Sequence, residues 1–255
     1  MSDLALRPMR DAATMTGRGI RLSRRDIEAL LTSLMLPVIL MLLFVYLFGG
    51  AMDVGTRYVN YVVPGVIILC AGFGAATTAV RVSQDLATGV LDRFRSMDVH
   101  PAALIAGHVA ASVLRNLASA VLVFAVAIAI GFRPHASVAG WFGAIGILVA
   151  FMLAVSWVSA TIGVVAGSPE AANGFTFVFM FLPYPSSAFV PVNTMPTWLR
   201  GFANHQPCTA FIESVRHLLA GSAAGTAPAV ALIWTAGILA VAIPLTSVAF
   251  RRHTR

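Results

Sequence analysis

The chain contains no lysine, because all seventeen of its basic residues are arginine. The phosphate-binding loop G-x-x-x-x-G-K-[ST] needs a lysine, so this protein does not hydrolyse ATP by that route. The zinc motif H-E-x-x-H and the nucleophile motif G-x-S-x-G are absent as well. We therefore expect no catalytic residues, no cofactor and no metal, and we expect that the chain is not itself an enzyme.

Charged residues are also scarce, at 11% of the 255 residues, whereas 58% are hydrophobic. Ordinary soluble domains carry about 25% charged residues, so this composition excludes them. Apolar runs of about 20 residues recur, which is the length that a helix needs to cross the hydrocarbon core of a bilayer. The formal net charge is +7, but the arginines stand at the ends of the apolar runs, so we expect no nucleic-acid partner. The composition predicts a polytopic membrane protein.

No aspartate or glutamate falls within any of the apolar runs. A carrier driven by protons or sodium ions usually needs an ionisable group near the middle of the membrane, so this absence argues against secondary transport. The best metal candidate is Glu213 with His217, near His205 and Cys208. Because the ligand set is incomplete, a polar helix edge is the better interpretation.

Cysteine is rare too. Cys70 falls inside an apolar run and Cys208 in a segment that reads as a polar loop. Residues at such different depths do not pair, so we expect no disulfide.

Hydropathy predicts six membrane spans, at residues 34–50, 61–80, 110–131, 140–166, 171–190 and 227–250. Residues 1–33 form a lead in which Ser23 opens a helix with Ile27, Leu30, Leu31 and Leu34 on one face. Such a helix is typical of one lying in the membrane interface, the alternative being a simple extension of the first span. We expect a single domain over residues 1–255, made of this lead, a six-span bundle over 34–250 and a tail at 251–255.

The arginine distribution predicts the orientation. The lead holds six arginines, residues 81–101 hold three and the tail holds three, whereas the opposite loops contain only Arg57, Arg133, Arg200 and Arg216. The positive-inside rule then places both termini in the cytosol. Two cytosolic termini require an even number of crossings, which agrees with six.

Small residues recur within the spans. Ala71, Ala75 and Ala79 lie four residues apart, and Gly140, Gly143 and Gly146 open the fourth span. Such spacing favours close helix packing in lipid, although alanine and glycine are simply common in this chain.

Residues 81–101 separate the second and third spans and are rich in charge. As a helix they would place Asp85, Gly89, Asp92 and Arg93 along one side and Leu86, Val90 and Phe94 along another. This pattern predicts an amphipathic cytosolic helix that docks a soluble partner. A solvated connecting loop is the alternative.

Four prolines, Pro183 and Pro185 near the end of the fifth span and Pro191 and Pro196 after it, are expected to break the helix near the outer surface. Residues 195–221 then read as two short amphipathic helices separated by Pro207. They are too short and too polar to cross a membrane. We expect them to dip into the outer leaflet and return, packed against protein or lining a wet cavity.

Arg115 and Asn116 form the most unusual pair inside a span. The arginine either snorkels to the cytosolic interface, which we favour, or faces a cavity and meets an anionic group. Candidates for a substrate pathway are the polar and aromatic residues Thr77, Thr78, Arg115, Asn116, Trp157 and Asn173.

Three stretches together resemble one known family. They are Asp85-x3-Gly89-x2-Asp92-Arg93-Phe94-Arg95-Ser96-Met97, then Phe189-Val190-Pro191-x3-Met195-Pro196-x-Trp198-Leu199, then Asn204-His205-Gln206-Pro207-x3-Phe211-x4-Arg216. With the order of the spans, they are similar to the permease subunit of a type-2 ATP-binding-cassette (ABC) exporter, nearest the daunorubicin/doxorubicin-resistance class. Where that family often has glutamate and proline, this chain has Asp85 and Asp98.

The resemblance implies an all-α bundle with an interfacial helix, a cytosolic coupling helix and extracellular re-entrant helices. It assigns coupling to a separate ABC ATPase to Asp85, Gly89, Asp92, Arg93, Phe94 and Arg95. It assigns an outer gate to Met195, Pro196, Trp198, Leu199, Pro207 and Arg216.

It further implies a homodimer, or a heterodimer with a second permease, in the lipid of a bacterial inner membrane. The expected function is efflux of hydrophobic drugs or antibiotics. Export of a lipid or polysaccharide, and a non-transport scaffold that recruits a cytosolic protein, are the alternatives.

Overall fold

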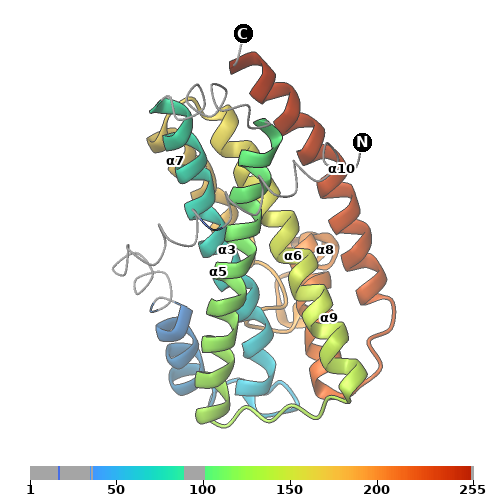
Figure 1. The fold of residues 1–255 in the computed structure, drawn as a ribbon. Coiled ribbons are helices and arrows are strands. Elements are labelled where there is room, and N and C mark those ends of the chain that lie inside the picture. The colour runs from blue at the N-terminus through green and yellow to red at the C-terminus, as the bar shows by residue number, and fades with distance from the viewer. Residues whose placement is uncertain (1–16, 18–34, 36, 89–100, 254–255) are drawn as a thin grey trace.

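The computed structural model describes residue 17, residue 35 and residues 37–88 and 101–253, and within them every regular element is a helix (Figure 1). The expected interfacial helix in residues 1–33 lies outside these residues. Four helices are long and apolar enough to cross a membrane: α3 (Tyr58–Ala87), α5 (Pro101–Ala129), α6 (Val138–Val165) and α10 (Ala227–His253). The all-helical, polytopic fold class is therefore confirmed.

The count of six spans is not confirmed. The first expected span contains a shorter apolar helix, Pro37–Phe48, which ends in the π-helical turn η1 (Phe44–Phe48). The fifth expected span, residues 171–190, contains α7 (Pro169–Phe181), and the helix stops there. Pro183 and Pro185 follow directly, and proline removes a backbone donor and disfavours a helical conformation in the residue before it. The helix therefore ends at Phe181, just before the prolines that were expected to break it, and does not extend to the expected end of the span at residue 190.

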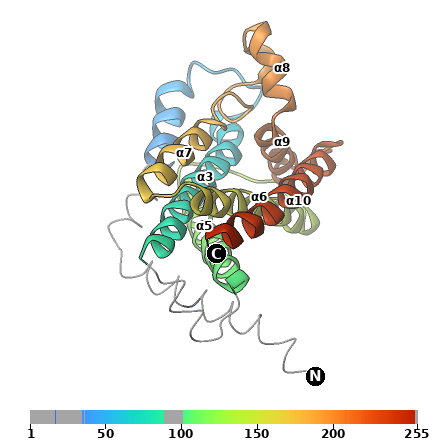
Figure 2. The same ribbon diagram turned by 90° about the horizontal axis from the view of Figure 1, so that it is seen from above.

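α3 stands at the centre of the bundle and packs on α5, α6, α7 and α9 (Figures 1 and 2). The predicted row Ala71, Ala75 and Ala79 is fully buried, which confirms its role in close packing. Gly163 of α6 brings the two backbones together, because a Cβ added there would lie 2.4 Å from the carbonyl oxygen of Ala79. Of the three glycines at the start of the fourth span, two serve close packing: Gly140 and Gly143 lie against Leu218 of α9. Gly146 has open space beside it.

α3 also runs further than predicted, through residues 81–87. The expected cytosolic helix therefore does not begin as a separate element at Arg81. Its remaining coupling residues, Gly89, Asp92, Arg93, Phe94 and Arg95, lie outside the described residues.

Residues 195–221 form the two predicted short helices, α8 (Thr197–His205) and α9 (Pro207–Ala220), with Pro207 in the first turn of the second. α9 packs on α6, α10 and α3. Cys208 therefore lies in a buried helix rather than a polar loop, and both cysteines are free thiols.

The helices bring distant segments together at two ends. At one end, here the Arg133 end, the loop after α5 meets the end of α9, where the backbone N–H of His135 donates to the carbonyl oxygen of Leu219 (Figure 1). At the other, the Asp85 end, the end of α3 lies near the start of α5. Gly221 closes α9 with φ +69°, a left-handed cap, and its Cα lies so close to the carbonyl of His135 that any side chain would clash.

Candidate functional site

Four of the six candidate pathway residues meet between α3 and α5. The guanidinium of Arg115 donates to the hydroxyl oxygens of Thr78 at 3.1 Å and of Thr77 at 3.4 Å. Asn116 Nδ2 donates to the carbonyl oxygen of Ala71 at 3.3 Å. Arg115 therefore bonds to the neighbouring helix, rather than only snorkelling to the interface as we favoured.

Asn116 is fitted tightly into this contact. A Cβ added at Gly74 would lie 1.7 Å from Asn116 Oδ1, so any larger residue there would displace the amide from its present position. The Oδ1 atom is buried and has no hydrogen-bond partner among the described residues. A hydrogen bond of 2.9 Å from the hydroxyl of Ser156 to that of Ser112 continues the polar contacts from α5 to α6. These groups join the helices to one another.

The other two candidate pathway residues lie elsewhere. Trp157 packs against an apolar cluster near the Asp85 end that includes Val82, Leu104 and Phe250. Asn173 is exposed on α7, beside the exposed Phe175 and Phe177. The six residues therefore do not line one continuous path within the part of the chain that the structure describes.

At the Asp85 end, a hydrogen bond connects the two helices that flank residues 89–100. His108 Nε2 of α5 lies 3.0 Å from Asp85 Oδ2 of α3, and the two side chains are 15% and 17% exposed. The sequence singled out Asp85 but not His108, since a histidine inside an apolar run carries no spacing signal of its own.

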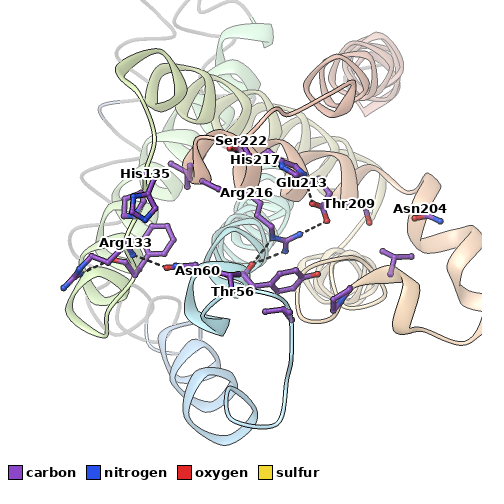
Figure 3. Close-up of a pocket in the computed structure, with 18 residues that line it drawn as sticks. Thr56, Asn60, Arg133, His135, Asn204, Thr209, Glu213, Arg216, His217 and Ser222 are labelled. Carbon is purple, nitrogen blue, oxygen red and sulfur yellow. Dashed lines mark hydrogen bonds and ion pairs between the residues drawn. The ribbon is translucent and has the colours of Figure 1, made fainter.

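At the Arg133 end, a polar basin of about 670 Å³ opens among α3, α9 and the loop after α5 (Figure 3). Asn60, Arg133, His135, Glu213, Arg216 and His217 contribute to its wall. This volume is within the range of small-molecule pockets, about 300–1,000 Å³. Asn60 Oδ1 accepts the backbone N–H of Arg133 at 3.1 Å, which ties α3 to the loop.

Arg216 holds the floor of the polar basin together. Its guanidinium donates to the carbonyl oxygens of Tyr61 (3.1 Å) and Ser187 (2.6 Å) and to Glu213 Oε1 (2.6 Å). It also lies 3.7 Å above the centre of the Tyr61 ring, a cation–π contact. Arg216 thus joins α9, α3 and the turn after α7 at one point.

The other expected gate residues are dispersed. Met195 is buried, and its carbonyl oxygen accepts Arg200 Nε at 2.7 Å. Pro196 caps α8, Leu199 is half-buried and Trp198 is 78% exposed. Pro207 begins α9. Of the six, only Arg216 lines the polar basin.

The two residues considered as metal ligands, Glu213 and His217, are hydrogen-bonded to other side chains. Glu213 accepts a hydrogen bond from Arg216, and His217 Nδ1 lies 2.8 Å from the hydroxyl of Ser222. Among the described residues, no group of three or more His, Cys, Asp or Glu side chains is placed to hold a metal ion.

A bundle of membrane-length helices with half-length helices packed inside it, and polar contacts between its helices, defines a multi-pass integral membrane protein. Comparison with known proteins identifies the family. Residues 11–220 match the ABC-2 type transporter family, and the chain belongs to that family.

Two relatives agree with this assignment. The chain is 32% identical over 224 residues to the daunorubicin resistance ABC transporter permease protein DrrB1 of Streptomyces coeruleorubidus, covering 87% of this chain and 79% of that protein. It is 24% identical over 231 residues to the probable doxorubicin resistance ABC transporter permease protein DrrC of Mycobacterium tuberculosis, covering 89% and 83%. The resemblance inferred from the three sequence stretches is thereby confirmed.

Proposed function

We propose that this chain is the permease subunit of an ATP-driven exporter of hydrophobic drugs or antibiotics. The observation that carries the proposal is the family match over residues 11–220, together with relatives whose names record daunorubicin and doxorubicin resistance. Apart from the Arg115 contacts between α3 and α5, the interior of the spans is largely apolar and rich in small residues, which suits an apolar cargo.

ATP is hydrolysed by a separate ABC ATPase in this proposal, because the chain has no lysine for a phosphate loop. Two permeases, identical or different, work with two ATPases. The docking contacts involve Asp85, Gly89, Asp92, Arg93, Phe94 and Arg95, and the arginine distribution supports cytosolic termini in a bacterial inner membrane.

The helix α3 is the transmitting element. Its 30 residues span about 45 Å at 1.5 Å per residue, with Asp85 near one end and Tyr61 near the other. A displacement of the Asp85 end therefore reaches the Tyr61–Arg216 contact under the polar basin without passing through a loop. Export then follows from a switch between two helix packings, with no chemistry in this chain.

The test is co-expression of the chain with its ATPase in a drug-sensitive bacterium, with measurement of daunorubicin accumulation. We expect accumulation to fall only when both proteins are present and the ATPase retains its phosphate-loop lysine. Equal accumulation with and without the pair, alongside normal amounts of both proteins in the membrane, would contradict a drug-exporting role. Export without any ATPase would contradict the proposed energy source.

A further inference from the structure

A second cavity, here the inner cleft, lies among α3, α6, α10 and the turn after α7. It encloses about 270 Å³, and its lining is almost entirely apolar. Gly72 of α3, Phe151 and Ser159 of α6, Trp234 of α10, and the prolines Pro183 and Pro207 take part in it. None of these residues lines the polar basin or belongs to the Arg115 contacts.

The inner cleft continues along the membrane-facing side of the bundle. An adjoining apolar trough of about 450 Å³ runs between α6 and α10 and shares Val158, Trp234 and Ile238 with the cleft. Because both helices are long enough to cross the membrane, a molecule dissolved in the bilayer reaches the cleft through the trough without passing through water.

Glycine keeps both cavities open. A Cβ added at Gly72 in the cleft, or at Gly237 in the trough, would meet no atom within 4 Å. A glycine inside a helix costs about 1 kcal/mol relative to alanine. At these two positions the glycine therefore makes no room for a neighbouring helix, as Gly163 does. It enlarges an empty volume.

The inner cleft has one polar group that lacks a partner. Ser159 is 6% exposed, and its hydroxyl makes no hydrogen bond within the described part of the chain. Ser156 and Thr161 on the same helix are both hydrogen-bonded. Its oxygen is not one of the fully buried side-chain atoms that lack a partner, so it is open to the cleft, where an occupant that carries a hydrogen-bonding group bonds to it.

We propose that the inner cleft is an access site, at which an apolar, ring-bearing molecule with one hydrogen-bonding group binds before export. An apolar cavity of about 150 Å³ holds benzene, so the cleft holds about two rings of a larger molecule whose remainder lies in the trough. Phe151 and Trp234 offer aromatic walls, and Ser159 bonds to the polar group. A lipid acyl chain would leave that hydroxyl unpaired, which favours the ring-bearing molecule. This inference rests on the proposed function, whose substrate class it makes specific.

The test measures binding of tritium-labelled daunorubicin to the purified full-length chain in lipid nanodiscs, without an ATPase. We expect saturable binding that Gly72→Leu weakens at least tenfold, because the leucine side chain grows into the cleft. Gly146→Leu is the matched control: it is also a helical glycine with open space at its Cβ, but it lines neither cavity. It should bind as the unaltered chain does.

Ser159→Ala tests the hydrogen bond with almost no change of volume. Loss of one hydrogen bond predicts binding weaker by roughly three- to tenfold. Gly72→Ala, which adds one carbon to the same space, should fold normally and weaken binding less than Gly72→Leu does.

Wild-type binding by Gly72→Leu would overturn the access site. Undiminished binding by Ser159→Ala would overturn the assigned hydrogen bond and favour an acyl chain.

The two proposals fail separately. If cells export daunorubicin but the isolated chain binds none, or Gly72→Leu binds normally, the drug-exporting function stands and the access site falls. If the isolated chain binds daunorubicin at the cleft but no ATPase drives its export, the access site stands and the exporting function falls.

Discussion

His108 Nε2 lies 3.0 Å from Asp85 Oδ2, so the end of α3 and the first half of α5 are fastened to each other on either side of residues 89–100. Asp85 is the one expected coupling residue that the structure describes. It is engaged within the chain, and it therefore positions the segment that follows it. Any force delivered to residues 89–100 reaches α3 and α5 together.

The first prediction concerns this contact between His108 and Asp85. Asp85→Ala and His108→Ala should each abolish drug-stimulated ATP hydrolysis by the assembled transporter, because either change removes the contact that fastens the Asp85 end of α3 to α5. The double variant should be no worse than either single one, since both remove the same contact. Hydrolysis is measured in proteoliposomes with and without daunorubicin. Asp53→Ala, in an exposed loop at the opposite end, is the control. Full stimulation in His108→Ala would show that Asp85 acts without its partner.

The second prediction concerns Arg216. Arg216→Ala removes bonds to two carbonyl oxygens and to Glu213, and should destabilise the protein by about 3 kcal/mol, because these partners are left in a partly buried site. The stability of Arg216→Lys should lie between those of the unaltered chain and Arg216→Ala. An ammonium group keeps the charge but lacks the planar fork that reaches several acceptors at once. The measurement is the fraction of monodisperse protein after heating, followed by size-exclusion chromatography.

Glu213→Gln provides the comparison for Arg216. It removes the charge but keeps an acceptor, so it should cost about 1 kcal/mol. Arg200→Ala is the control at the same end of the bundle, because that exposed residue bonds through Nε only to Met195. If Arg216→Ala were as heat-resistant as Arg200→Ala, Arg216 would not hold the floor of the polar basin.

The sequence predicted most of the helices because apolar runs and proline positions are local signals. The starts of α6 and α10 agree with expectation to within two residues. Hydropathy alone placed the end of the fifth span at residue 190, because the run of apolar residues continues past Phe181, whereas the helix break expected from Pro183 and Pro185 agrees with the observed end of α7.

The site was harder to predict, because it depends on contacts between helices. Thr77, Thr78, Arg115 and Asn116 were chosen as polar residues in apolar surroundings, and they do meet. Their bonding to one another, however, follows from the register of α3 against α5, which no single-helix pattern contains. The inner cleft was not predicted at all, because neither composition nor hydropathy indicates where packed helices leave a cavity between them.

The third prediction concerns the contact between α3 and α6. Gly163→Ala places a methyl group 2.4 Å from the carbonyl oxygen of Ala79, a backbone atom that cannot move without displacing α3. Overpacking of this kind costs about 1–3 kcal/mol, so the midpoint of heat-induced aggregation should fall by several degrees. Gly146→Ala meets nothing within 4 Å and should leave the midpoint unchanged or raise it, since alanine is the better helix former. Equal midpoints for the two variants would contradict the close approach of these helices.

The fourth prediction concerns the orientation in the membrane. The structure supplies a clean background for cysteine labelling, because Cys70 and Cys208 are both buried free thiols and should not react in the folded protein. Ala223→Cys places an exposed thiol at the Arg133 end, and Thr88→Cys places one at the Asp85 end. With a membrane-impermeant maleimide on spheroplasts, we expect labelling of Ala223→Cys at once and of Thr88→Cys only after permeabilisation.

The unaltered chain is the control for this experiment and should remain unlabelled in both conditions until detergent denatures it. The result bears on the whole proposed mechanism, because an ATPase in the cytosol reaches residues 89–100 only if the Asp85 end faces it. Labelling of Thr88→Cys in intact spheroplasts would place that end outside. The arginine count would then have given the wrong orientation, and α3 could not carry force from a cytosolic motor to the polar basin.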